Sequence, residues 1–228
     1  FLVAATITAV IIIKNKKVSI IKNGNIRLLF ETVGHPVLSF DRIKEKHEGS
    51  VLISTALIII YYAVTVLKSM FSGFSFNHFD EASFNALFIL VRSVGAVLLW
   101  SICNWAVGAL FGGKGTLKEI YITVGYCLLP LIFGDAVYLA VSNVLTSNEG
   151  AFLGIFSTIM IMATAFYITV GMIRIHDYSF GEFVLTSILT VIGMVLIIFF
   201  LFLVGVLLQQ LAGFIITLVT ELITVLGG

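Results

Sequence analysis

Long uninterrupted apolar runs are the feature of this sequence that most restricts its fold. Five runs reach the roughly 20 residues that an α-helix needs to cross the ~30 Å hydrocarbon core of a bilayer. Only 11% of the residues are charged, whereas a soluble domain carries roughly 25%. The sequence therefore predicts an all-α, polytopic membrane bundle with spans near Val51–Met70, Ala86–Phe111, Glu119–Val144, Phe152–Arg174 and Phe183–Leu208.

A shorter apolar run at residues 1–13 stops at the lysines that begin with Lys14. Thirteen helical residues reach only about 20 Å. The lysines follow this run, whereas a secretory signal carries its positive charge in front. We therefore interpret residues 1–13 as the C-terminal part of a truncated transmembrane helix, and residues 14–50 as a basic linker.

Basic residues predict the orientation of the spans, because cytoplasmic loops accumulate lysine and arginine. Of the 13 basic residues, only Lys68 falls on the far side and only Arg92 within a span. The other 11 share one side: Lys14, Lys16, Lys17, Lys22, Arg27, Arg42, Lys44, Lys46, Lys114, Lys118 and Arg174. The linker is thus expected in the cytoplasm, and the C-terminus and Asn148 outside.

Two further segments carry apolar residues at helical spacing. In the linker these are Ile26, Leu29, Val33, Val37, Phe40 and Ile43. They indicate an amphipathic elbow lying in the cytoplasmic interface, interrupted at Gly34 and restarted at Pro36; the alternative is a solvated linker. Residues 209–228 are expected to form an outer interfacial or half-inserted helix.

Short motifs in a fixed order resemble the Yip-one domain family of Ypt/Rab-interacting-protein-like polytopic membrane proteins, in its bacterial type. Gly125-Tyr126, followed by Pro130 in the third span, is the part shared most widely. The other motifs are Pro36, Phe40, Ile43-Lys44, Gly49-Ser50, Asn104-Trp105, Gly112-Gly113-Lys114-Gly115 and Leu117-Lys118.

The resemblance covers residues 35–228 and implies a five-span domain with a cytoplasmic N-terminus and its C-terminus on the far side. It also implies a multi-pass protein of a bacterial plasma membrane. Eukaryotic members bind prenylated Rab-type GTPases through an Asp-Leu-Tyr-Gly-Pro motif before the first span. This sequence lacks that motif, so we do not transfer the GTPase-binding role.

Gly108, Gly113 and Lys114 have the spacing of a phosphate-binding loop, but Gly115 replaces the required Ser or Thr, and a membrane helix replaces the preceding strand. We expect a tight cytoplasmic turn and no nucleotide. Gly108-x-x-x-Gly112 and Gly150-x-x-x-Gly154 have a spacing that allows close helix packing. Packing inside the bundle is favoured over a dimer interface.

His176-Asp177 resembles a metal-binding dipeptide, but the other histidines are scattered over both sides of the membrane. We expect this pair to cap the fifth span beside Ser179 and Gly181. Cys103 and Cys127 lie in apolar runs without metal-ligand spacing and are expected to be buried. No set of residues with a catalytic pattern is found, so the sequence predicts no enzyme, no cofactor, no metal site and no nucleic-acid partner.

Arg92 and Asp135 are the candidate functional residues, because a charge inside a span costs about 2.5–3.5 kcal/mol and rarely faces lipid. Counting residues from the outer ends of the second and third spans places both at a similar depth. The sequence therefore predicts an intramembrane Arg92–Asp135 pair. The alternative is that Arg92 extends to the surface and Asp135 is hydrogen-bonded as a structural residue.

These features favour a non-enzymatic scaffold or anchor that organises a membrane transport or lipid-handling assembly. Its expected partners are the lipid bilayer and other membrane proteins, or further copies of the chain. The alternative function is a small-solute or ion permeation subunit that uses Arg92 and Asp135, with a helix kink at Pro130.

Overall fold

The computed structural model describes residues 24–73, 76, 84–146 and 149–226. This described part is helical with connecting turns and contains no strand. Its elements are α2 (Gly24–Gly34), α3 (Pro36–Glu45), α4 (Val51–Phe71), α5 (Ala86–Leu90), the π-helix η2 (Val91–Gly95), α6 (Ala96–Leu110), α7 (Leu117–Cys127), α8 (Leu129–Ser142), α9 (Gly150–His176) and α10 (Phe180–Leu226).

Among the described residues, five stretches are long and apolar enough to cross a membrane, which confirms the predicted fold class. α4, α9 and α10 are continuous helices, α5, η2 and α6 together form the second span, and α7 and α8 form the third. The predicted stub at residues 1–13 lies outside the described residues. The third span begins at Leu117 rather than at the predicted Glu119.

Pro130 accounts for the division of the third span into α7 and α8. It lies in the first turn of α8, where its missing N–H costs little, whereas inside a continuous helix it would remove a hydrogen bond and clash with the preceding turn. Leu128 N instead donates to Gly125 O at 3.3 Å, which closes the end of α7.

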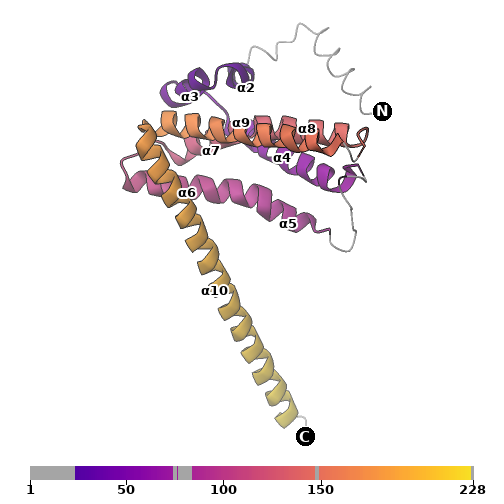
Figure 1. Ribbon diagram of the computed structural model, residues 1–228. Coiled ribbons are helices and arrows are strands. Elements are labelled where there is room, and N and C mark those ends of the chain that lie inside the picture. The colour runs from indigo at the N-terminus through magenta and orange to yellow at the C-terminus, as the bar shows by residue number, and fades with distance from the viewer. Residues whose placement is uncertain (1–23, 74–75, 77–83, 147–148, 227–228) are drawn as a thin grey trace.

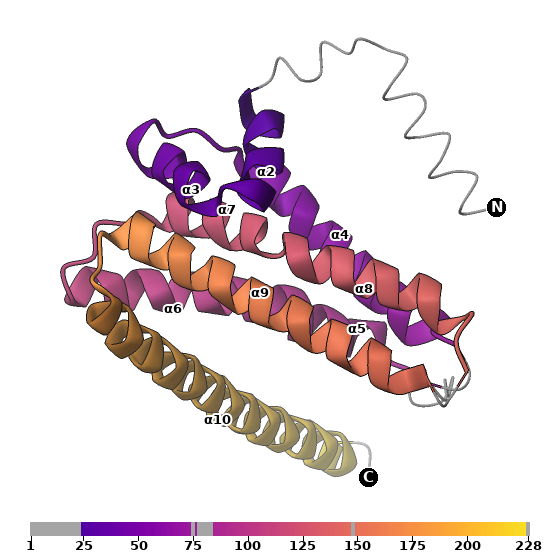
Figure 2. The same cartoon turned by 45° about the horizontal axis from the view of Figure 1, so that its top comes forward.

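The spans from α4 to α9 lie side by side, with α7 at their centre (Figures 1 and 2). α7 packs against α4, α6 and α9. Most of its residues from Glu119 to Cys127 are buried, and Tyr126 and Cys127 are fully inaccessible. We call the end of the bundle that carries Ser50, Lys114 and His176 the basic end.

α10 is a single helix of 47 residues, about 70 Å long at 1.5 Å per residue. The separate helix predicted for residues 209–228 is therefore wrong. Gln209 and Gln210 are good helix formers and no proline follows, so nothing in the sequence stops the helix there. The first part of α10 packs against α6 and α9, and the rest extends away from the bundle (Figure 1).

α2 and α3 form a helical hairpin on one flank of the bundle, where α3 packs against α9 and α7 (Figure 2). As predicted, the helix is interrupted after Gly34 and restarts at Pro36. Leu28, Phe40 and Ile43 have no exposed surface and belong to the same core as α4, α7 and α9. The hairpin is thus a packed part of the fold.

Candidate functional site

An ion pair lies inside the bundle, toward the end opposite the basic end. Lys68 Nζ, on α4, lies 2.5 Å from Asp135 Oδ1, on α8. The same ammonium lies 4.3 Å from the centre of the Tyr138 ring, a cation–π contact. The Lys68 and Asp135 side chains are only 28% and 16% exposed. Both charged groups are therefore largely shielded from solvent, and each one compensates the charge of the other.

The structure gives Asp135 a different partner from the predicted Arg92. Arg92 is exposed on η2, and α4 packs against both η2 and α8. α4 therefore contacts both of the elements that carry these two charges, and it supplies Lys68 as the partner of Asp135.

The Gly125-Tyr126 motif forms a very close contact between two spans. A Cβ at Gly125 would lie 1.9 Å from Ser54 Oγ of α4, and that hydroxyl donates to Tyr121 O at 2.9 Å. Tyr126 is fully buried and is hydrogen-bonded to the backbone of Ser50. This motif therefore fixes the contact between α4 and α7.

His176 is the centre of a buried polar cluster at the basic end. It is 1% exposed, its Nε2 lies 2.9 Å from Asn104 Oδ1, and Asn104 Nδ2 donates to Thr190 Oγ1 at 3.4 Å. The imidazole stacks on Tyr178, with the ring centres 4.8 Å apart. The cluster therefore joins α6, α9 and α10 and is a structural crosslink between three spans.

Two atoms of this cluster have no hydrogen-bond partner within the described part of the chain: His176 Nδ1 and the Tyr178 hydroxyl. Both face Gly113, where a Cβ would lie 2.4 Å from His176 Nδ1 and 2.3 Å from the Tyr178 oxygen. Burial raises the pKa of the Tyr178 phenol, so it stays protonated at neutral pH.

The glycine turn that resembles a phosphate-binding loop is occupied by the protein's own side chains. His176 and Tyr178 fill the space beside Gly113. Lys114 Nζ lies 3.2 Å from Asp177 Oδ2, and Lys114 N donates to His176 O at 3.3 Å. The turn therefore holds the end of α9.

The structure corrects the predicted cap of the fifth span. His176 and Asp177 end α9, and Asp177 adopts the left-handed conformation at φ 58°. Ser179 caps α10 instead, since its N–H donates to Glu182 Oε2 at 2.7 Å and Glu182 N donates back to Ser179 Oγ at 3.4 Å. The sequence carries this signal, because Ser-x-x-Glu before an apolar run is a capping box.

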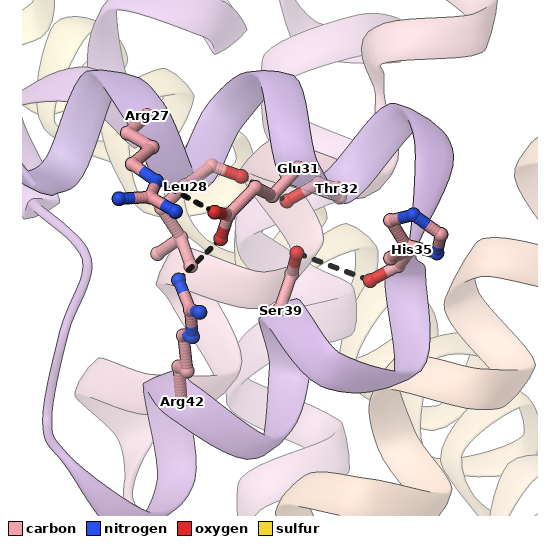
Figure 3. A network of polar contacts seen from close by, with 7 residues as sticks. All are labelled: Arg27, Leu28, Glu31, Thr32, His35, Ser39 and Arg42. Carbon is pink, nitrogen blue, oxygen red and sulfur yellow. Dashed lines mark hydrogen bonds and ion pairs between the residues drawn. The ribbon is translucent and has the colours of Figure 1, made fainter. Parts of the chain in front are cut away.

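Charged residues join the α2–α3 hairpin to itself and to the bundle. Glu31 bonds Arg27 at 2.8 Å and also pairs with Arg42 (Figure 3). Asp41 pairs with Arg174 of α9 at 3.0 Å. Lys44 Nζ donates to Ile175 O at 2.5 Å. These bonds connect the hairpin to the basic end of α9.

Only some of the glycines in the two predicted Gly-x-x-x-Gly motifs lie at close contacts between helices. A Cβ at Gly108 would lie 2.6 Å from His176, and one at Gly150 would lie 2.8 Å from Phe76. Gly112 and Gly154 have nothing within 4 Å of a Cβ. Close contacts that the motifs do not indicate occur at Gly171 against Thr123, at 2.6 Å, and at Gly134 against Met160, at 2.6 Å.

Across the described residues, no group of three or more His, Cys, Asp or Glu side chains is placed to hold a metal ion. Cys103 and Cys127 are free and buried, as predicted. His47 Nδ1 lies 3.1 Å from Glu119 Oε1, while Glu119 also completes a capping box with Thr116 at the start of α7. These polar side chains serve to position helices.

Comparison with known protein families identifies a domain that covers most of the chain. The family model of the Yip1 domain, the Yip-one domain that the motifs resemble, matches residues 30–203. The match begins in α2, ends in α10 and covers more than half of the chain. No curated protein and no solved structure matches the chain.

Proposed function

The chain belongs to the Yip1 domain family, and from this premise we propose that it is a non-enzymatic membrane scaffold. In this function it anchors the proteins of a membrane transport or lipid-handling assembly in the bilayer. The basic end would face the cytoplasm of a bacterial cell and the far end the outside. The pattern of basic residues supports this orientation, and the missing Rab-binding motif supports the bacterial assignment.

The Lys68–Asp135 ion pair is the observation that carries the proposal. A permeation pathway that used the intramembrane Asp135 would need this carboxylate free to exchange a solute or ion. Here the intramembrane carboxylate is already bound to an ammonium at 2.5 Å, with Tyr138 against the same ammonium. Such a closed pair stabilises one arrangement of α4 and α8 and leaves little charge for a transported solute.

α10 offers the surface on which partners would assemble. Apolar side chains are exposed along residues 195–219, among them Phe199, Phe202 and Phe214. In the bilayer, lipid or the helices of other proteins must cover them, since they carry no polar group to face water. Partner membrane proteins or a second copy of this chain would pack along this helix.

The permeation alternative has one specific observation in its favour. α4 packs against both η2, which carries Arg92, and α8, which carries Asp135. Arg92 also lies in the π-helix η2, and π-helical turns occur frequently at functional sites. A direct flux measurement separates the two functions.

We expect proteoliposomes that contain the purified chain to be no more permeable than protein-free liposomes. Potassium and proton flux would be followed with entrapped dyes, and glycerol flux by light scattering. The matched control is the Asp135→Asn variant, which removes the charge from the pair. Flux in the unaltered chain that disappears in Asp135→Asn would instead establish permeation and contradict the scaffold.

The orientation gives a second expected result. In a chain with Cys103 and Cys127 replaced by alanine, single cysteines are introduced at Lys114 and at Val144, which is 82% exposed at the far end. A membrane-impermeant maleimide added to intact cells should label the Val144 position. It should label the Lys114 position only after lysis. The opposite pattern would show that the basic end lies outside.

A further inference from the structure

The α2–α3 hairpin follows α9 down from the basic end. Lys44 bonds Ile175 O, Asp41 pairs with Arg174, and the carbonyl of Val33 accepts from the Tyr167 hydroxyl at 2.8 Å. Tyr167 and Ile175 lie eight residues apart on one helix, or about 12 Å. Because α9 is a membrane span, the turn of the hairpin lies about 12 Å deeper than its open end.

The polarity of the hairpin changes along the same direction. Around the turn, three apolar side chains are strongly exposed: Phe30 is 72% exposed, Val33 58% and Leu38 61%. The His35 side chain is exposed beside them. At the open end the side chains are charged and make the contacts of Arg27, Asp41 and Lys44. Exposed apolar groups thus gather at the turn, near Tyr167, and charges lie beside the end of α9 at the basic end.

Three carbonyl groups around the turn are paired by the protein itself. Glu31 O accepts from His35 N at 2.7 Å, and His35 O accepts from Ser39 N at 3.2 Å. Ser39 Oγ also donates to His35 O (Figure 3). Val33 O, which has no further helical donor in this arrangement, is bonded by Tyr167. This pairing lowers the cost of bringing these three carbonyl groups into lipid.

The deepest carboxylate of the hairpin is also neutralised. Glu31 lies between the turn and the open end, and it pairs with both Arg27 and Arg42 (Figure 3). Two guanidinium groups around one carboxylate reduce the cost of placing it below the surface.

We propose that the α2–α3 hairpin is inserted turn first into the leaflet at the basic end, where Phe30, Val33 and Leu38 contact acyl chains. Half of a bilayer's hydrocarbon core is about 15 Å thick, so a turn at this depth remains in one leaflet. The hairpin therefore adds volume to that leaflet alone and acts as a wedge that favours its convex curvature. This membrane-shaping activity goes beyond the scaffold function and does not depend on it.

The depth is tested on the full chain in vesicles of phosphatidylcholine and phosphatidylglycerol. A nitroxide is attached to a cysteine at Leu38 or, as the matched control, at Lys46, with Cys103 and Cys127 replaced by alanine. We expect the Leu38 label to collide with oxygen and to be protected from a water-soluble nickel complex, and the Lys46 label to show the reverse. Access of nickel to Leu38 overturns insertion, as does protection of Leu38 from both reagents, which indicates coverage by protein.

The wedge is tested in one continuous membrane, a giant vesicle of that composition with a narrow tube pulled outward from it, because a chain with five spans does not exchange between separate vesicles. We expect the unaltered chain, with its basic end on the outer side, to be enriched on the tube. The Phe30→Ser/Val33→Ser/Leu38→Ser variant should lose this enrichment, while Phe30→Leu/Val33→Ile/Leu38→Ile should retain it. Equal density of the unaltered chain on tube and vesicle would overturn the wedge, and so would enrichment that survives the three serines.

Discussion

Replacing Lys68 by methionine is expected to destabilise the bundle by about 3–5 kcal/mol, because it leaves the Asp135 carboxylate unpaired in a low-dielectric environment. Asp135→Leu should cost less. Lys68 lies near the end of α4, and its long side chain reaches the surface more easily than the short side chain of Asp135. The double variant should be much closer to the unaltered protein, since it leaves no unpaired charge. Apparent unfolding temperatures in detergent measure all three.

Arg92→Leu provides the matched control for this comparison of the Lys68 and Asp135 single variants with the double variant. Since Asp135 is bound to Lys68, the effects of Arg92→Leu and Asp135→Leu should add within experimental error, whereas those of Lys68→Met and Asp135→Leu should not. Strong non-additivity between Arg92 and Asp135 would restore the pair that the sequence predicts. Simple additivity between Lys68 and Asp135 would contradict the pair seen in the structure.

Gly125→Leu is expected to prevent the spans from assembling, and Gly125→Ala to destabilise them by about 1–3 kcal/mol, the usual cost of an overpacked core. Even the alanine Cβ would lie 1.9 Å from Ser54 Oγ and 3.0 Å from Ser54 Cα. α4 must then move away from α7, which weakens the Ser54–Tyr121 hydrogen bond. The measurements are the yield of monodisperse protein in detergent and its apparent unfolding temperature.

Gly154→Ala is the matched control, because Gly154 also lies in a membrane span and a Cβ there meets nothing within 4 Å. Alanine should be neutral or slightly stabilising at this position, given its higher helix propensity. Gly125→Ala/Ser54→Gly should recover part of the lost stability by removing Ser54 Oγ and Cβ. Equal effects of alanine at Gly125 and Gly154 would show that the α4–α7 contact is not as close as described.

Helix interruptions could be predicted wherever the sequence contains a glycine or proline that favours a break in the helix. Gly34-His35-Pro36 gives the break between α2 and α3, and Pro130 gives the break between α7 and α8. The capping boxes of Thr116-Glu119 and Ser179-Glu182 were equally readable. The continuity of α10 through Gln209 was not predicted. The thickness of a membrane limits how much of a helix lies in lipid, but it does not end the helix, and no residue near Gln209 does so.

The candidate site was predicted less completely than the spans. Asp135 was identified from the cost of an intramembrane charge, and Gly125, Tyr126 and Pro130 from short motifs. The sequence predicts Arg92 as the partner of Asp135, whereas the structure pairs Asp135 with Lys68. The environment of His176 was not predicted. The sequence places Lys68 on the far side of the membrane. Asn104 lies 72 residues from His176 in the chain. Both contacts depend on which helix faces are turned toward each other.

The sequence by itself determined the five membrane-spanning stretches, since a run of about 20 apolar residues with paired backbone groups has few alternatives to a helix in lipid. It also determined where prolines and capping residues divide those helices, because each of these residues affects only the backbone within a few positions of itself. Only the tertiary structure decided that Asp135 pairs with Lys68 and that Gly125 meets Ser54. It also decided that the α2–α3 hairpin descends along α9. Helix rotation and the choice of neighbours depend on the simultaneous packing of all the spans, which no single segment specifies.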